Sequence, residues 1–178
     1  LLTAGDATIY AFEPAPMTFD KLTENIQREQ FYPFELALDE SSGRRVMYFS
    51  EKNPYLTSLS EWSAYGGTRD FVKLEVESVT GDDFCELKKV SKIDILKIDA
   101  EGHDYNVLKG FEKKIRSDKI GMIQFEYNFF TFIAGNSLKK FFDLLSPNFI
   151  IGRLLPNGVE IVGYHPVLEN FSQANFVA

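Results

Sequence analysis

The stretch Asp99-Ala100-Glu101-Gly102-His103 is the densest group of chemically capable side chains in the sequence. It joins a predicted buried strand directly to a predicted helix, so Asp99 is expected to face the crevice beyond the strand and Glu101 to lie near the helix N-terminus. Asp99 and Glu101 can orient a substrate hydroxyl or bind a hard cation through oxygen. A helix N-terminus disfavours an imidazolium, so His103 can serve as a neutral base. Simpler interpretations stay open, because Glu101 can cap its helix and His103 can be structural.

Two more acidic residues stand at the ends of predicted strands. Glu13 closes an apolar strand and is followed by Pro14, and Glu126 lies near the end of another apolar run. In open α/β sheets, ligands bind outside the carboxyl ends of the strands. A carboxylate only accepts hydrogen bonds, so Glu13 can hold both hydroxyls of a ribose. It can equally be a solvated side chain at a strand end.

Alternating strand and helix patterns must position these residues. Apolar runs predict strands over 34–38, 46–49, 72–79, 93–98 and 120–127 after a first strand over 7–13, and helical spacing predicts helices over 17–29, 82–89, 103–116 and 137–146. Segments 149–154 and 159–164 flank Pro156-Asn157-Gly158, a hairpin signal. The pattern predicts a single α/β domain over 1–178, with a mostly parallel sheet and a C-terminal antiparallel hairpin.

The segment from 50 to 69 differs from the rest of the chain. It contains Pro54, Gly66 and Gly67, with hydroxyl and large apolar residues interleaved. A loop of this length inside a compact domain is often functional, so it can form one side of a substrate site. A packed surface excursion is the alternative.

Composition excludes several classes of protein. The 178 residues carry a net charge of -7, whereas nucleic acids and anionic membranes attract clustered positive charge. No apolar run reaches the roughly 18 residues that a membrane span needs, and the single cysteine, Cys85, cannot form an intrachain disulfide. We expect a cytoplasmic protein with a small-molecule or glycan partner, and no residues are assigned to a metal.

Four segments, taken in order, resemble the FkbM family of S-adenosylmethionine-dependent methyltransferases. They are Ile9-Tyr10-Ala11-Phe12-Glu13-Pro14, Leu96-Lys97-Ile98-Asp99-Ala100-Glu101-Gly102-His103, Val107-Leu108-Lys109-Gly110 and Ile123-Gln124-Phe125-Glu126-Tyr127-Asn128. Each motif alone is weak, whereas the ordered set is specific and covers nearly the whole chain.

The resemblance implies a Rossmann-like methyltransferase fold with strand order 3-2-1-4-5-7-6 and S-adenosylmethionine as the cofactor. By this analogy Glu13 would hold the cofactor ribose, and the backbone around Leu38 and Asp39 would border the adenine. The residues expected to line the acceptor side, and so to be catalytic, are Asp99, Glu101, His103 and Glu126.

The resemblance also implies that the family's first strand and its glycine-rich turn would lie before Leu1. We therefore expect a methyltransferase-like domain that lacks this strand and loop. Since that strand is the centre of the family's sheet, the two strands beside it would each be left with an open edge.

The function expected from the resemblance is O-methylation of a hydroxyl on a sugar, glycan or natural product. His103 or Asp99 would act as the base, with Glu101 or Glu126 positioning the hydroxyl. Two alternatives stay open. One is a non-catalytic methyltransferase-like scaffold domain of a larger glycan-assembly protein, and the other is a nucleotide- or NAD-binding Rossmann domain.

Overall fold

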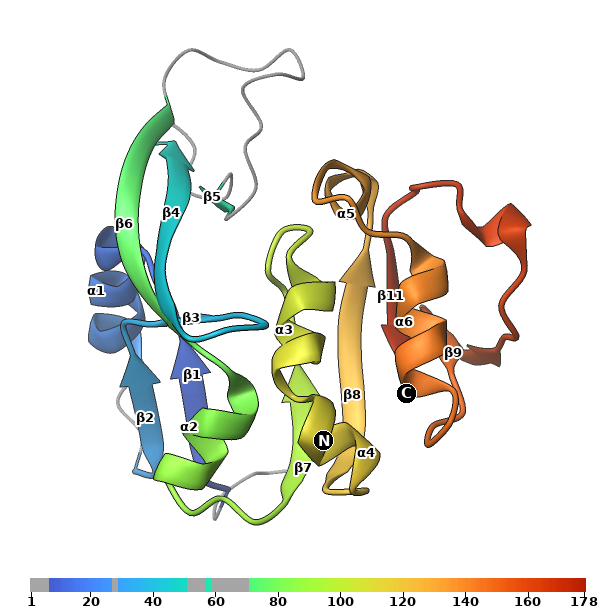
Figure 1. The fold of residues 1–178 in the computed structure, drawn as a ribbon, viewed down its shortest axis with the longest axis horizontal. Coiled ribbons are helices and arrows are strands. Elements are labelled where there is room, and N and C mark those ends of the chain that lie inside the picture. The colour runs from blue at the N-terminus through green and yellow to red at the C-terminus, as the bar shows by residue number, and fades with distance from the viewer. Residues whose placement is uncertain (1–6, 27–28, 51–56, 59–70) are drawn as a thin grey trace.

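A computed structural model describes residues 7–26, 29–50, 57–58 and 71–178 (Figure 1). Its first half contains β1 (Ile9–Phe12), α1 (Pro16–Asn25), β2 (Phe31–Phe34), β3 (Ala37–Leu38), β4 (Gly43–Ser50), β5 (Thr57–Ser58), β6 (Phe71–Val79) and α2 (Gly81–Leu87). Its second half contains β7 (Ile93–Lys97), α3 (Asp104–Gly110), α4 (Glu112–Arg116), β8 (Ile120–Tyr127), α5 (Phe129–Ile133), α6 (Leu138–Leu145), β9 (Gly152–Leu155), β10 (Gly158–Ile161), a 3-10 turn (Pro166–Leu168) and β11 (Ala174–Val177). Apart from Ser50 and β5, the predicted functional loop over 50–69 lies outside the described residues.

The strands form three sheets, with orders β1-β2, β3-β6-β4-β5 and β10-β9-β11-β8-β7. The pairs β1–β2, β3–β6 and β7–β8 are parallel. The remaining described pairs are antiparallel, so the sheets are mixed and the prediction of a mostly parallel sheet is wrong. The largest departure is the long β4–β6 pair, which runs antiparallel from Gly43 opposite Ser78 to Ser50 opposite Phe71.

The C-terminal part combines a predicted element with an unpredicted one. The hairpin is present, because β9 and β10 pair antiparallel across the turn at Pro156 and Asn157. β11 was not predicted, and it lies between β9 and β8, antiparallel to both. Only Phe176 of this strand is buried, so the sequence carries little strand signal there.

The main core lies between the five-stranded sheet and helices α3, α4 and α6. Figure 1 shows α3 and α6 across one face of this sheet. The predicted apolar face of the helix at 137–146 is confirmed, because Leu138, Phe141, Phe142 and Leu145 are all buried. Phe125 of β8 stacks on Phe141, with ring centroids 4.7 Å apart. Burying each such ring contributes about 1.5–3 kcal/mol, so this layer holds β8 in place.

Two strands near the centre of Figure 1 have an open edge among the described residues. β1 pairs with β2 and β7 with β8, and no described strand pairs with the other edge of either β1 or β7.

The helix predicted over 103–116 is divided at Phe111 into α3 and α4. At the end of α3, Gly110 lets the helix pack closely against the chain after β3, since a Cβ there would lie 2.2 Å from the carbonyl oxygen of Asp39.

Candidate active site

Three of the four predicted catalytic residues meet at the carboxyl ends of β7 and β8. A cavity of about 470 Å³ is lined by Asp99, Glu101, Glu126, Asn128, Phe129, Phe130, Phe171, Gln173 and Asn175. The acidic residues come from the turn after β7 and from β8, the first two phenylalanines from α5, and the last three residues from β11 and the segment before it. The three residues come together because the carboxyl ends of neighbouring parallel strands lie at the same edge of a sheet.

The turn after β7 has an unusual backbone. Glu101 and Gly102 both have a positive φ, 48° and 91°, and the peptide NH of His103 donates to the carbonyl of Ala100 at 3.0 Å. A Cβ on Gly102 would lie 2.5 Å from the carbonyl carbon of Phe130. Glycine is therefore required at 102, because α5 approaches the turn too closely for any side chain.

We expect Gly102→Ala to destabilise the protein by about 2–5 kcal/mol, the sum of the left-handed backbone penalty and the overpacking against Phe130. For a chain of this size that lowers the melting temperature by roughly 4–20 °C, measured by circular dichroism. Gly135→Ala is the matched control, since Gly135 also has a positive φ but has nothing within 4 Å of its Cβ position. Equal losses in the two variants would contradict the close approach of α5.

Glu101 has the protonation behaviour of an acid–base group. Burial, together with the negative charges of Glu126, Asp99 and Asp104, raises its pKa to about 7. A carboxyl with a pKa near the working pH can take a proton from a reacting hydroxyl and release it again. Asp99 is more exposed and pairs with Lys97, 2.9 Å away.

Glu126 forms the inner wall of the cavity. Its residue surface is only 7% exposed, and its Oε1 accepts a hydrogen bond from the Nε2 of Gln173 at 2.5 Å. Antiparallel pairing places Asn175 directly opposite Glu126. Gln173, just before β11, and Asn175, within it, thus place amides beside the buried carboxylate. Sequence reasoning missed both because the strand was not recognised.

Asp104 was also missed, although it adjoins the predicted block. It is fully buried, and its carboxylate accepts hydrogen bonds from the peptide NH of Glu126 at 3.0 Å and of Ala100 at 3.3 Å. Burial raises its pKa to about 6, although these NH groups act in the opposite direction. Asp104 therefore ties the turn after β7 to the end of β8, and an acidic residue in the first turn of a helix was the available signal.

His103 is placed apart from the other predicted catalytic residues. Its Nε2 lies 2.9 Å from the Oδ1 of Asp39, whose other oxygen accepts a hydrogen bond from Arg45. Burial alone would raise the pKa of Asp39, but the hydrogen bonds from His103, Arg45 and the peptide NH of Glu40 together lower it. His103 joins α3 to the end of β3 and does not line the cavity.

The predicted cofactor residues lie at the ends of β1 and β3. Glu13 follows β1, and its Oε1 accepts the peptide NH of Ala15 at 2.8 Å. Burial raises its pKa, and this hydrogen bond partly offsets the increase. Leu38 ends β3 and Asp39 follows it. These three residues are not part of the 470 Å³ cavity.

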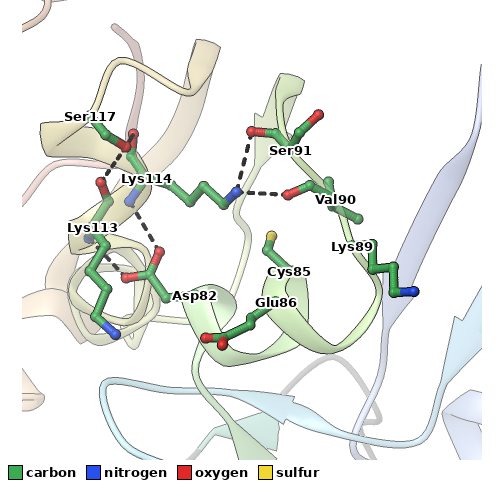
Figure 2. A pocket seen from close by; sticks show the side chains of 9 residues that line it. All are labelled: Asp82, Cys85, Glu86, Lys89, Val90, Ser91, Lys113, Lys114 and Ser117. Atoms are coloured by element: carbon green, nitrogen blue, oxygen red, sulfur yellow. Dashed lines mark hydrogen bonds between the residues drawn. The ribbon is translucent and has the colours of Figure 1, made fainter.

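A second hollow, of about 410 Å³, lies between α2 and α4 (Figure 2). Asp82 accepts hydrogen bonds from the peptide NH groups of Lys113 and Lys114 at 2.8 and 3.0 Å, so it caps α4. From the sequence alone, Asp82 would be expected to cap the helix that it begins, α2. The Nζ of Lys114 donates to the carbonyl of Val90 at 2.7 Å. These polar groups hold elements together, and none of the predicted site residues lies here.

Neither a metal-binding cluster nor a membrane-spanning helix is found among the described residues. No group of three or more His, Cys, Asp or Glu side chains is arranged there to hold a metal ion. No helix in the same part of the chain is both long and apolar enough to cross a membrane.

The fold and the acidic cavity fit a methyltransferase domain, and the comparison with protein families confirms the resemblance. Residues 2–155 match the methyltransferase FkbM domain, so the chain belongs to this family.

Two curated relatives carry more specific names. The hexuronic acid methyltransferase AglP of Haloferax volcanii is 33% identical over 113 residues, which is 62% of this chain and 44% of that protein. The 2-O-methyltransferase NoeI of Sinorhizobium fredii is 26% identical over 169 residues, 86% of this chain and 67% of that protein. This chain thus spans less than half of AglP and two thirds of NoeI.

Among solved structures, the methyltransferase FkbM of Methylobacillus flagellatus is similar, with 12% identity and a TM-score of 0.49. The similarity covers 96% of this chain and 36% of that one.

Proposed function

We propose that this protein is an S-adenosylmethionine-dependent O-methyltransferase that acts on a sugar hydroxyl. The observation that carries the proposal is Glu101, a carboxyl with a pKa of about 7 in a cavity shared with Glu126. Membership of the FkbM family supports methyl transfer, and the names of the two curated relatives support a sugar-type acceptor and transfer to oxygen.

The strand orders support a Rossmann-like methyltransferase architecture. The strand orders β2-β1 and β7-β8-β11-β9 are compatible with the parts 3-2 and 4-5-7-6 of the order 3-2-1-4-5-7-6, and no described strand pairs with the second edge of β1 or of β7. In this interpretation β11 is the antiparallel strand seven. A parallel strand paired with both of these edges would complete a continuous sheet.

The residues at the ends of β1 and β3 fit the cofactor. The Oε1 of Glu13 accepts the NH of Ala15, and a carboxylate retains further acceptor capacity that suits the two hydroxyl donors of a ribose. The side chain of Asp39 is engaged by His103 and Arg45, and its peptide NH donates to the carbonyl of Val79 at 3.1 Å. The chain at Leu38 and Asp39 would therefore border the adenine by packing against it.

S-adenosylmethionine, when bound, supplies a methyl group already activated on a sulfonium, so the protein's task is alignment and proton transfer. We assign Glu101 as the general base: its carboxylate accepts the proton of the acceptor hydroxyl as the oxygen–carbon bond forms and the carbon–sulfur bond breaks. The buried carboxylate of Glu126 accepts a hydrogen bond from a neighbouring hydroxyl of the acceptor and so orients it. Glu101 then releases its proton to water, which a pKa of about 7 permits near neutral pH.

Calorimetric titration of S-adenosylhomocysteine into the full-length protein tests the proposal. We expect Glu13→Gln to weaken binding about tenfold, because the amide keeps an oxygen for Ala15 but loses the charge and one acceptor. Glu24→Gln removes the same charge from an exposed position on α1 and should leave the affinity unchanged. No binding to the unmodified protein would contradict the proposal and favour the non-catalytic scaffold.

A further inference from the structure

His103 is bound from outside its own helix. It stands at the N-cap of α3, and its Nε2 lies 2.9 Å from the Oδ1 of Asp39, 64 residues earlier in the chain. The side chains of His103 and Asp39 are 13% and 4% exposed, so the contact is largely shielded from water. In Figure 1 the chain between β3 and β4, which begins at Asp39, extends toward α3. The contact therefore joins the end of β3 to the start of α3.

Asp39 is itself held in place. Its Oδ1 accepts a hydrogen bond from the peptide NH of Glu40 at 2.7 Å, and its Oδ2 accepts one from the Nε of Arg45. Burial alone would raise the pKa of Asp39, but the hydrogen bonds that its carboxylate accepts lower it, so the group is ionised near neutral pH. An ionised carboxylate only accepts hydrogen bonds, so the Nε2 of His103 is the donor in this pair. This nitrogen therefore cannot take a proton from a substrate.

The turn that ends at His103 is the one that carries Glu101. Glu101 has a positive φ of 48°, which is an uncommon conformation for a residue with a side chain. The peptide NH of His103 donates to the carbonyl of Ala100 at 3.0 Å, so the turn closes directly on the histidine. A strained backbone of this kind persists only where the surrounding groups hold it. A displacement of His103 is therefore expected to displace Glu101, two residues before it.

Two buried carboxylates hold this turn. Asp104 accepts hydrogen bonds from the peptide NH of Ala100 and from a peptide NH of β8, which ties the turn to β8. Asp39 binds His103 and so ties the turn to β3. The two carboxylates act at the two ends of the turn and come from different elements. Asp39 is expected to influence the place of Glu101 through the imidazole.

α3 packs closely on the chain that follows β3. A Cβ at Gly110 would lie 2.2 Å from the carbonyl oxygen of Asp39, and the Nδ2 of Asn106 donates to the Oε1 of Glu40 at 3.3 Å. The Asn106 contact joins the same two segments as the His103 contact does, but Glu40 is exposed. Its removal therefore takes away a surface contact between these segments while the contact beside the turn is kept.

We propose that His103 is a positioning residue for Glu101: Asp39 and Arg45 fix its imidazole, and the imidazole fixes the turn from which Glu101 reaches the cavity. This role rests on the proposed function, in which Glu101 is the base, and adds the residues that set its position. It replaces the role of base that the residue type suggests for His103, because the Nε2 donates to Asp39. The end of β3 and the turn after β7 are thus parts of one hydrogen-bonded unit.

Two amide substitutions separate the contact from the rest of the side chain. Asparagine is favoured at an N-cap, so His103→Asn should preserve α3, but its amide is too short to reach Asp39. Glutamine places an amide nitrogen as far along the side chain as the Nε2 of histidine, so His103→Gln should restore the hydrogen bond. Glu40→Ala is the control, because it removes only the side-chain contact with Asn106. Circular dichroism measures whether each variant is folded.

Carbon-13 NMR of labelled glutamate carboxyls in the full-length protein reports the surroundings of Glu101, and Glu101→Gln assigns its signal. The titration midpoint is expected near pH 7, because burial and neighbouring negative charges raise the pKa of Glu101 to about 7. These charges belong to Glu126, Asp99 and Asp104. In His103→Asn the released turn exposes Glu101 to water, so its midpoint should fall by at least about 1 pH unit. His103→Gln and Glu40→Ala should keep the midpoint, and an unchanged midpoint in folded His103→Asn would overturn the inference.

The rate of methyl transfer is the second readout. We expect His103→Asn to lower kcat by about 10- to 100-fold, since a displacement of about 1 Å can cost this much. The affinity for S-adenosylhomocysteine should stay within about twofold, because Asp39 keeps its bonds to Arg45 and to the peptide NH of Glu40. His103→Gln should recover most of the rate, and Glu40→Ala should retain all of it. Equal rates in the two His103 variants would overturn the inference.

The two readouts separate this inference from the proposed function. A protein that does not bind S-adenosylhomocysteine would contradict the proposed function, and the NMR midpoint would still decide whether His103 positions Glu101. Normal binding and normal transfer in folded His103→Asn would overturn the positioning role and leave the proposed function standing.

Discussion

Replacing Glu101 by glutamine is expected to lower methyl transfer by about 10²- to 10⁴-fold, the usual contribution of a general base. The amide has nearly the same shape but cannot accept the hydroxyl proton. Binding of S-adenosylhomocysteine should stay within about twofold of the unmodified protein, because Glu101 lines the cavity that we assign to the acceptor and Glu13 does not. Glu160→Gln, at an exposed position on β10, is the matched control and should retain full activity.

The pH dependence gives this prediction a second readout. The pKa of Glu101 is raised to about 7, and the base works only when ionised. The rate should therefore fall about tenfold for each pH unit below 7 and level off above it. The residual activity of Glu101→Gln should not show this fall in rate below pH 7. A variant with near-normal activity, or an unchanged step in its profile, would remove Glu101 from the mechanism.

Replacing Asp104 by alanine is expected to reduce both stability and activity. Its carboxylate holds the buried peptide NH groups of Ala100 and Glu126, and each buried donor left without a partner costs about 1–3 kcal/mol. The free energy of unfolding should therefore fall by about 2–6 kcal/mol in denaturant titration. Transfer should fall as well, because the turn carrying Glu101 is no longer tied to β8. Asp104→Asn keeps the shape of the side chain and one acceptor oxygen, so it should lose less stability and less activity than Asp104→Ala.

The contribution of Asp104 should also depend on pH in a defined direction. Its pKa rises from 3.8 to about 6 in the folded protein, so the native state binds the proton more tightly than the unfolded state. The stability it contributes is complete below about pH 4 and declines as pH rises through 6. The deficit of Asp104→Asn relative to the unmodified protein should therefore shrink between pH 4 and 6. A deficit that grows over this range would show that the NH groups dominate and that the pKa is lowered.

Local sequence patterns were sufficient to predict the bounds or the buried face of a single strand or helix. The strand over 120–127 has the predicted bounds, and the apolar face of α6 follows directly from helical spacing. Asp99, Glu101 and Glu126 were also grouped correctly, because strand ends at the same edge of a sheet lie close together.

Long-range pairings were beyond local reasoning. His103 and Asp39 are separated by 64 residues, and nothing near either residue indicates that a buried carboxylate will bind the imidazole. β11 inserts between β8 and β9, and a short strand with one buried side chain has no periodicity to detect. The amides of Gln173 and Asn175, which lie beside Glu126, were missed for this reason.

The most direct test of the central claim is mass spectrometry of sugar acceptors after incubation with the full-length protein and S-adenosylmethionine that carries a deuterated methyl group. The account predicts a deuteromethyl ether on a sugar, with the yield reduced at least about 100-fold in Glu101→Gln. Labelled product formed equally by the variant, or no labelled sugar from a protein that binds S-adenosylhomocysteine normally, would contradict it.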